Sequence, residues 1–318
     1  TPDTVLAKEA GLELGIKGSI VVNDRMETSV PDIYAAGDAV QVKHYVTGND
    51  ALISLAGPAN KHGRIIADNI CGGDSRYLGS QGSSVIKVFD MTAATTGINE
   101  TNAKKSGLEV DTVILSPMSH AGYYPGGKVM TMKVVFEKET YRLLGAQIIG
   151  YEGVDKRIDV LATVIHAGLK ATQLKDLDLA YAPPYSSAKD PVNMAGFMID
   201  NIAKGTLKQW HLEDMDKISK DKNVVLLDVR TVGEFNRGHM KGFNNIPVDE
   251  LRERISEIEK GKPVYLICQS GLRSYIASRI LEGNGYETYN FSGGFRFYDT
   301  VVNDRALIER AYACGMDY

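Results

Sequence analysis

The sequence predicts a chain of several domains, of mixed α/β and α+β class. The length of 318 residues is enough for two or three domains of roughly 100–200 residues each. Gly/Ser-rich or Gly-Thr stretches interrupt the pattern near residues 81 and 206, and the order of strands and helices differs on the two sides of residue 206. We therefore expect domains over residues 1–81, 82–205 and 206–318.

In the first domain, the apolar run over residues 18–24 predicts a strand. Residues 28–40 predict a proline-marked turn and then a buried strand that ends at Gly37-Asp38. A helix is expected over residues 51–70, because its apolar spacing is helical and Gly72-Gly73 follows it.

In the second domain, strands come first and helices follow, which is typical of an α+β fold. The expected strands cover residues 85–89, 112–116, 129–136 and 143–149. One face of the next segment carries Val154, Ile158, Leu161, Ala162 and Ile165 at helical spacing. Asp190 then caps a further helix that has Pro191 in its first turn.

In the third domain, short apolar runs alternate with helical patterns, which indicates a parallel α/β sheet. Buried strands are expected over residues 224–228 and 264–268, and helices over 251–260 and 274–283. Cys268 then lies at the carboxyl end of its strand, where ligands bind in sheets of this kind.

The composition excludes several classes of protein. The net charge of −4 gives no general attraction to nucleic acid or to anionic membranes. No apolar run reaches the roughly 20 residues of a membrane-spanning helix, so we expect a cytoplasmic protein. The three cysteines, Cys71, Cys268 and Cys314, form no Cys-x-x-Cys pair, so neither a disulfide framework nor a zinc site is suggested. Cys314 is expected to have a packing role.

Cys268 is followed by Gln269, Ser270, Gly271, Leu272 and Arg273, which join a strand to a helix. Backbone N–H groups of such a loop and the helix N-terminus converge on the sulfur and stabilise a thiolate. Arg273 adds a positive charge that suits an anionic substrate. The alternative is that Cys268 is a small buried residue at a strand end.

The surroundings of the loop favour the catalytic interpretation. They comprise Asp228-Val229-Arg230, Glu234-Phe235, the segment Arg237 to Gly242 and Asn245-Ile246-Pro247. In this order and spacing they resemble the rhodanese family of sulfurtransferases over about residues 206–318. The resemblance implies that Cys268 carries a sulfane sulfur as a persulfide. We expect Asp228 and Arg230 to form a structural ion pair, and we assign no catalytic role to His239.

Two alternatives to sulfur transfer remain for this domain. One is a phosphatase-like domain, although the arginine here is the fifth residue after the cysteine, and dual-specificity phosphatases of the same fold have one residue more. The other is a sulfur-binding or regulatory module without turnover of its own.

Residues 28–40 resemble the second flavin-contacting motif of the pyridine nucleotide-disulfide oxidoreductases. The resemblance implies that Gly37, Asp38 and Ala39 contact FAD. No Gly-x-Gly-x-x-Gly fingerprint for FAD or NAD(P)H is present in the sequence. In this family both fingerprints and the flavin-adjacent cysteine precede the Gly-Asp motif, so residues 1–81 are expected to be the end of the FAD/NAD(P)-binding region.

The order of domains resembles that of the coenzyme A-disulfide reductase and rhodanese fusions, also described as NADH-dependent persulfide reductases. The resemblance implies FAD, NAD(P)H and coenzyme A as cofactors, a thiol, disulfide or persulfide substrate, and a homodimer whose tyrosines reach the partner's active site. Tyr185 is the first candidate tyrosine. Tyr123 and Tyr124 share the second position, and the sequence does not separate them.

The segment 60–64 contains the basic residues Lys61, His62 and Arg64. Two interpretations of this cluster are open. It contacts a phosphate of coenzyme A, or it is a solvated helix face.

Overall fold

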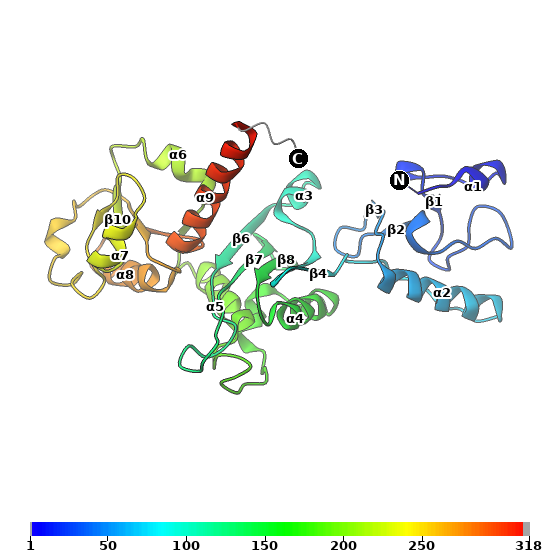
Figure 1. The fold of residues 1–318 in the computed structure, drawn as a ribbon, viewed down its shortest axis with the longest axis horizontal. Coiled ribbons are helices and arrows are strands. Elements are labelled where there is room, and N and C mark those ends of the chain that lie inside the picture. Colours follow the sequence, from blue (N-terminus) through cyan, green and yellow to red (C-terminus); the bar gives the residue numbers. More distant parts are fainter. Residues whose placement is uncertain (1, 314–318) are drawn as a thin grey trace.

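The computed structural model describes residues 2–313, and Cys314 lies outside the described residues. Three sheets follow one another along the long axis of the molecule, each with its own helices (Figure 1). This arrangement confirms the predicted mixture of α/β and α+β folds. Within the described part of the chain, no helix is long and apolar enough to cross a membrane.

The N-terminal block has a three-stranded sheet of order β1-β2-β3. Its strands are β1 (Ile20–Val21), β2 (Val40–Lys43) and β3 (Asp50–Ala51), and its helices are α1 (Val5–Glu9) and α2 (Ala56–Ile70). The predicted helix over 51–70 therefore begins five residues late. Pro58 then lies in the first turn of α2, where its missing N–H would have had no partner.

The expected strand ending at Gly37-Asp38 is wrong. Gly37–Ala39 form a 3-10 helix, and the strand β2 begins after them. Among the described residues, the segment before Gly37 makes only an isolated bridge, between Glu27 and Tyr34. An extended segment becomes a strand only where a neighbouring strand takes up its hydrogen bonds.

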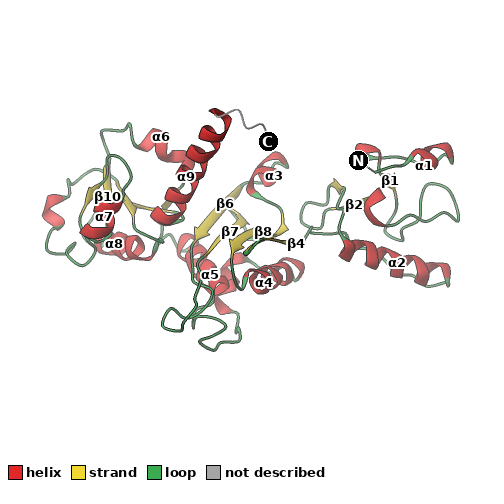
Figure 2. Cartoon of the chain, viewed as in Figure 1, coloured by secondary structure: helices red, strands yellow, loops and turns green. Residues whose placement is uncertain are grey.

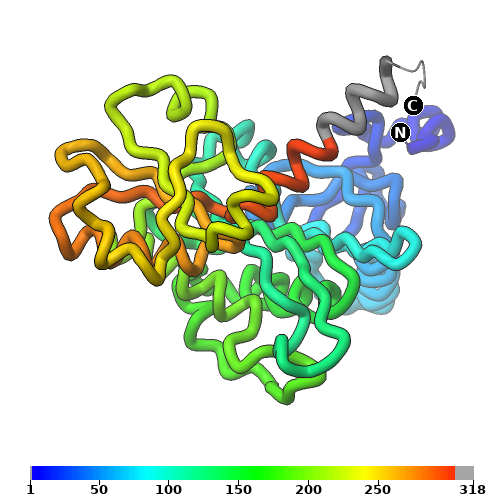
Figure 3. The backbone as a smooth tube through the Cα atoms, turned by 60° about the vertical axis from the view of Figure 1, so that its left-hand side comes forward, coloured from blue at the N-terminus to red at the C-terminus, as the bar shows by residue number. Residues whose placement is uncertain are grey.

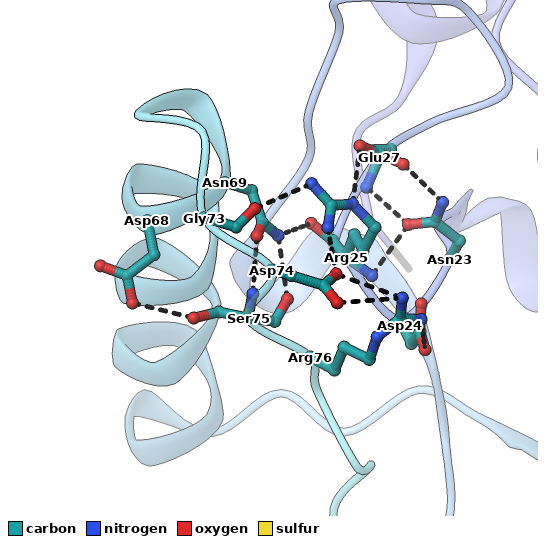
Figure 4. Close-up of polar contacts among 10 residues, drawn as sticks. All are labelled: Asn23, Asp24, Arg25, Glu27, Asp68, Asn69, Gly73, Asp74, Ser75 and Arg76. Atoms are coloured by element: carbon teal, nitrogen blue, oxygen red, sulfur yellow. Dashed lines mark hydrogen bonds and ion pairs between the residues drawn. The ribbon is translucent and has the colours of Figure 1, made fainter.

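Polar contacts fasten the turn around Arg25 to the segment that follows α2 (Figure 4). The buried side chain of Asn69 donates to the carbonyl oxygens of Arg25 and Ser75, both at 3.0 Å, and accepts from the N–H of Ser75 at 2.8 Å. Arg25 also pairs with Glu27 and Asp74. Because these ion pairs are exposed, the amide of Asn69 contributes more to the stability of this junction than they do.

The central block is an antiparallel sheet of order β4-β5-β8-β7-β6. Its strands are β4 (Ser84–Val88), β5 (Met91–Gly97), β6 (Val110–Leu115), β7 (Met130–Glu137) and β8 (Leu143–Gly150). Its helices are α3 (Glu100–Lys105), α4 (Val154–His166) and α5 (Pro191–Ala203), with a 3-10 helix over Ala171–Asp176. Figure 2 shows α4 and α5 along one face of the sheet, where they enclose the largest apolar core. The Asp190 side chain caps α5 as predicted, accepting from the Val192 N–H at 3.0 Å.

The C-terminal block is a parallel sheet of order β11-β10-β12-β13-β9, which confirms the predicted parallel fold. Its strands are β9 (Gln209–Trp210), β10 (Val225–Asp228), β11 (Asn244–Asn245), β12 (Val264–Ile267) and β13 (Thr288–Phe291). Its helices are α6 (Met215–Ile218), α7 (Val232–Arg237), α8 (Leu272–Glu282) and α9 (Gly294–Ala313).

The expected helix over residues 251–260 is wrong. This segment forms turns and a short 3-10 helix over Ile255–Glu257. Leu251 and Ile258 are buried, so the apolar spacing was real. The hydroxyl of Tyr286, however, lies 3.2 and 3.0 Å from the carbonyl oxygens of Ile255 and Ile258, acceptors that a continuing helix would use itself.

The C-terminal block covers the open edge of β6. The side chain of Gln209 donates to the carbonyl oxygen of Thr112 at 2.8 Å, and the N–H of Ile114 donates to the hydroxyl of Ser292 at 3.0 Å. The carboxylate of Asp111 also accepts from Gln209 and lies 3.1 Å from Nε2 of His211. These contacts satisfy an edge strand that would otherwise leave its N–H and C=O groups unpaired.

Candidate functional site

Cys268 lies directly after β12, and the loop from Cys268 to Gly271 connects this strand to α8. The side chain is buried, with 1% of its surface exposed. Its sulfur accepts a hydrogen bond from the N–H of Gly271 at 3.1 Å, and the hydroxyl of Ser274 lies 3.2 Å from the sulfur and 3.1 Å from the carbonyl oxygen of Gly271, between which it shares its hydrogen. Two donors aimed at one sulfur stabilise negative charge on it. Ser274 is a site residue that the sequence analysis missed.

Arg273 is paired with a carboxylate. Both of its terminal nitrogens donate to the two carboxylate oxygens of Glu234 at 2.7 Å. The hydrogen bonds from Arg273 lower the pKa of Glu234 to about 2, so this carboxylate is ionised at neutral pH. The positive charge that the sequence analysis expected at Arg273 is thus balanced by the carboxylate of Glu234. Glu234 was missed as a site residue, although its place at N3 of a Thr-x-x-Glu capping box was visible in the sequence.

The predicted ion pair between Asp228 and Arg230 is confirmed. Both side chains are buried, and the closest nitrogen and oxygen lie 2.7 Å apart. The guanidinium also lies over the ring of Phe295, 3.8 Å from its centroid. The side chain of Asn245 donates to the carbonyl oxygens of Asp228 and Arg230 at 2.8 Å each. These contacts fix the strand end beside the cysteine loop.

The start of α9 packs against the cysteine loop. The N–H of Phe295 donates to the carbonyl oxygen of Cys268 at 2.8 Å. Gly294 has a φ of +69°, and a Cβ at this position would lie 2.7 Å from Gln269 O and Ser270 N. Only glycine fits this position, since any larger residue would displace the loop.

Two loops of the central block project side by side in both views of the chain (Figures 1 and 3). The first joins β6 to β7, and the second joins the 3-10 helix 171–176 to α5. Their tips meet where the hydroxyls of Tyr123 and Tyr181 lie 2.7 Å apart. The hydrogen bond to Tyr123 is the main reason why the pKa of Tyr181 lies above its usual value.

The other two candidate tyrosines do not belong to this pair. Tyr124 contacts the ring of His120 edge-on, with the ring centroids 5.7 Å apart. Tyr185 is exposed, and its hydroxyl has no hydrogen-bond partner among the residues that the structure describes. The structure therefore pairs Tyr123 with Tyr181, a tyrosine that the sequence analysis missed four residues before Tyr185.

The Gly37-Asp38 turn lies beside the start of α2. Gly37 has a φ of +78°, and the Asp38 side chain is exposed. The N-cap residue of α2 is Leu55, which has no polar atom with which to cap the helix, so its first N–H groups remain available. The exposed carboxylate can accept hydrogen bonds from FAD hydroxyls, and the uncapped helix end can donate to a phosphate. The left-handed glycine lets the backbone come close to the cofactor.

The three basic residues of α2 do not form one cluster. His62 is buried, burial lowers its pKa, and its Nδ1 accepts from the N–H of Gly37 at 3.2 Å. A contact between His62 and a coenzyme A phosphate was therefore a wrong expectation, because the ring faces the protein. Lys61 and Arg64 are exposed and line a groove of about 970 Å³ between α2 and α4, where Arg64 also pairs with Asp68.

Comparison with known proteins defines the class of protein. Residues 1–63 match the pyridine nucleotide-disulphide oxidoreductase model, and residues 83–191 match the dimerisation domain of the same family. Residues 211–299 match the rhodanese-like domain. The chain belongs to the pyridine nucleotide-disulphide oxidoreductases and also contains a rhodanese-like domain.

Several known proteins are similar to this chain. The reduced CoADR-RHD of Bacillus anthracis superposes with a TM-score of 0.93 at 47% identity, over 96% of this chain and 55% of that one. An NAD-dependent persulfide reductase from A. fulgidus gives a TM-score of 0.85 at 41% identity, over 94% and 54%. An NAD(P)H sulfur oxidoreductase (CoA-dependent) from Pyrococcus furiosus is 40% identical over 191 residues, which are 60% of this chain and 43% of that protein. The chain thus spans about half the length of these relatives.

Proposed function

We propose that this chain is part of a flavin-dependent NAD(P)H reductase of coenzyme A disulfide, persulfides or polysulfides, in which the rhodanese domain carries sulfane sulfur on Cys268. The observation that supports this most is that the Gly271 N–H and the Ser274 hydroxyl both lie within 3.2 Å of the buried Cys268 sulfur, at the carboxyl end of a parallel strand. The likeness to CoADR-RHD over 96% of the chain supports the pairing of the two activities.

Cys268 supplies the nucleophile for sulfur transfer. Its thiolate attacks the outer sulfur of a donor such as a persulfide or thiosulfate, so that a new S–S bond forms, the donor's S–S bond breaks and a thiolate or sulfite leaves. An acceptor thiolate then attacks the outer sulfur of the Cys268 persulfide and takes it, which returns Cys268 to the thiolate. No net oxidation or reduction of the enzyme occurs in these two steps.

The groups around the loop support sulfur transfer over phosphate hydrolysis. A phosphate dianion binds best to arginines whose charge is available. Arg230 and Arg273 are each paired with a carboxylate, Asp228 and Glu234, at 2.7 Å. The backbone N–H of Gly271 and the hydroxyl of Ser274 remain as the donors to the sulfur.

For the reductase half, Gly37, Asp38 and Ala39 would contact FAD, which when bound accepts a hydride from NAD(P)H and supplies the electrons that cleave the S–S bond. The Tyr123–Tyr181 pair would donate a proton or a hydrogen bond to the thiolate that leaves, at the active site of the partner subunit. Lys61 and Arg64 would contact a phosphate of coenzyme A. Tyr185, which lines the same cavity as Tyr181, and Tyr124 remain candidates for the same proton donation.

Under this proposal residues 1–81 end the FAD/NAD(P)-binding region, residues 82–205 form the dimerisation domain and residues 206–318 form the rhodanese domain. The assembly is a homodimer in the cytoplasm, and its substrate is a small thiol, disulfide or persulfide.

Sulfur loading tests the rhodanese half. After incubation with thiosulfate or a polysulfide, intact-mass measurement should show a gain of one sulfur atom, about 32 Da, that dithiothreitol removes. Cys268→Ser should abolish the gain, and Cys71→Ser, a change at an exposed cysteine, should not. A Cys268→Ser protein that still loads sulfur at the wild-type level would exclude the proposal, and loading without transfer to coenzyme A would leave only a sulfur-binding module.

Flavin reduction tests the reductase half. The full-length protein should show a flavin spectrum that NADH or NADPH bleaches, and the comparison of the two nucleotides identifies the preferred one. A full-length protein that binds no flavin would contradict the assignment of residues 1–205.

A further inference from the structure

Arg157 of α4 is a buried arginine at the base of the two tyrosine loops, with 1% of its surface exposed. Its Nη2 donates to the carbonyl oxygen of Ser119, in the first loop, at 2.9 Å. The same nitrogen donates to the hydroxyl of Ser186 at 3.2 Å and to the carboxylate of Asp190 at 2.9 Å, both in the second loop. One guanidinium therefore joins both loops to α4.

The partners of Arg157 are themselves tied together. Ser186 donates to Asp190 at 2.7 Å, and the carbonyl oxygen of Ser186 accepts from the N–H of Ala121 in the first loop at 3.0 Å. Asp190 is buried and also caps α5. The ion pair of Arg157 and Asp190 is thus saturated with hydrogen bonds, the condition under which a buried pair holds a defined geometry.

The backbone makes room for this guanidinium. Gly153, at the start of α4, has a φ of +69°, and a Cβ at this position would lie 2.0 Å from Nη1 of Arg157. The carbonyl oxygen of Gly153 accepts from the same nitrogen at 3.1 Å.

Arg157, Ser186 and Asp190 together are called the clamp below. The clamp holds segments that are close in sequence to the tyrosines. Tyr123 is two residues from Ala121, whose N–H the second loop holds. Tyr181 precedes Ala182, whose carbonyl oxygen accepts from the N–H groups of Tyr185 and Ser186. Tyr123 and Tyr181 are themselves exposed. Since little packing holds the two side chains, their 2.7 Å contact depends on the relative position of the loops.

We propose that Arg157, with Asp190 and Ser186, is a positioning residue for the reductase reaction. It fixes the relative position of the two loops that bring Tyr123 and Tyr181 together. With 1% of its surface exposed, Arg157 offers a substrate almost no contact area, so it acts through the tyrosine pair. The inference rests on the proposed role of that pair in proton donation.

Arg157→Lys in the full-length, FAD-loaded protein tests this. Lysine keeps the charge and loses the planar fork, so it cannot reach Asp190, Ser119 and Ser186 at once. We expect kcat for disulfide or persulfide reduction to fall about tenfold or more, as small misplacements of catalytic groups do. Arg254→Lys, at an exposed arginine paired with Glu250 and Glu257, is the matched control and should leave kcat unchanged.

A double-mutant cycle with Tyr181→Phe separates positioning from general destabilisation. If Arg157 acts through the pair, Arg157→Lys should lower kcat much less in the Tyr181→Phe background than in wild type. If the fall in kcat of the double variant equals the product of the falls caused by Arg157→Lys and Tyr181→Phe alone, the inference is overturned. A Tyr181→Phe protein with wild-type kcat would instead overturn the proposed role of the pair, so the two failures are distinguishable.

Ser186→Ala keeps the test decisive if Arg157→Lys does not fold. It removes one hydroxyl from the clamp and leaves the ion pair in place, so the protein should fold. We expect a smaller fall in kcat, which again disappears in the Tyr181→Phe background. A fall in kcat of the same factor in both backgrounds would contradict the inference.

Discussion

Glu234→Gln removes the charge that holds Arg273 beside the cysteine loop. In the wild type two hydrogen bonds of 2.7 Å join the pair, and Glu234 also accepts from the N–H of Thr231 at 3.0 Å. The amide keeps one acceptor oxygen and places an NH₂ group against the guanidinium, so about one charged hydrogen bond is lost. Such a bond contributes about 1.5–3 kcal/mol, and we expect a loss near the lower value, because the Glu234 side chain is 22% exposed and solvent screens it.

The pH dependence of this loss has a defined direction. The hydrogen bonds from Arg273 lower the pKa of Glu234 from 4.5 to about 2 in the folded state. A carboxylate with a lowered folded pKa stabilises the protein fully above its unfolded pKa, and this stabilisation disappears as the pH falls towards the folded value. The difference between wild type and Glu234→Gln should therefore be constant above pH 4.5 and shrink between pH 4.5 and 2.

The fluorescence of Trp210 can be used to measure this loss of stability. It is the only tryptophan of the sequence, and it is buried in the C-terminal block, 4.4 Å from the ring of Phe291. Its fluorescence during urea unfolding therefore reports on this domain alone. Glu257→Gln, at an exposed partner of Arg254, should barely move the midpoint. A Glu234→Gln midpoint equal to that of wild type at pH 7, or a difference that grows on acidification, would refute the reasoning.

Two further changes test other contacts. Gly294→Ala should slow sulfur loading of Cys268 by about tenfold, because its Cβ meets the loop backbone at 2.7 Å, whereas Gly285→Ala, with a similar φ and open space, should change the rate by no more than about twofold. Asp111→Ala should speed tryptic cleavage between the central and C-terminal blocks, since Asp111 accepts from Gln209, and exposed Asp249→Ala should not. Equal rates for the two glycine variants, or equal cleavage of the two aspartate variants, would contradict these explanations.

The parts of the fold that the sequence predicted correctly are those with a clear apolar pattern, either a continuous apolar run or apolar residues at regular spacing. The strands β7, β8, β10 and β12 and the helices α4 and α8 all follow it. The strand β5 was missed because small and hydroxyl residues form its core face, with Ala94 and Thr96 buried. The helix predicted over residues 251–260 was wrong for the opposite reason. The segment has helical spacing, but the Tyr286 hydroxyl is hydrogen-bonded to two of its carbonyl oxygens.

The candidate site was predictable where its residues are adjacent in sequence, as in the loop from Cys268 to Arg273. Partners from distant segments were not predictable. Glu234 lies 39 residues before Arg273, and Tyr181 lies 58 residues after Tyr123. A sequence shows which side chains are present but not how far apart they lie in space. Tyr185, which follows two prolines, was therefore as good a candidate as Tyr181.

The contact between Ser292 and Ile114 has a mechanical consequence. Ser292 is bonded to the edge of the central sheet, and Gly294, two residues later, abuts the backbone of the cysteine loop. Only Gly293 separates these two anchoring points. Because the chain between them is so short, a displacement of strand β6 at Ile114 is passed on to the Cys268 loop. Any distortion of the β6 edge is therefore transmitted to the geometry around Cys268 over a path of three residues.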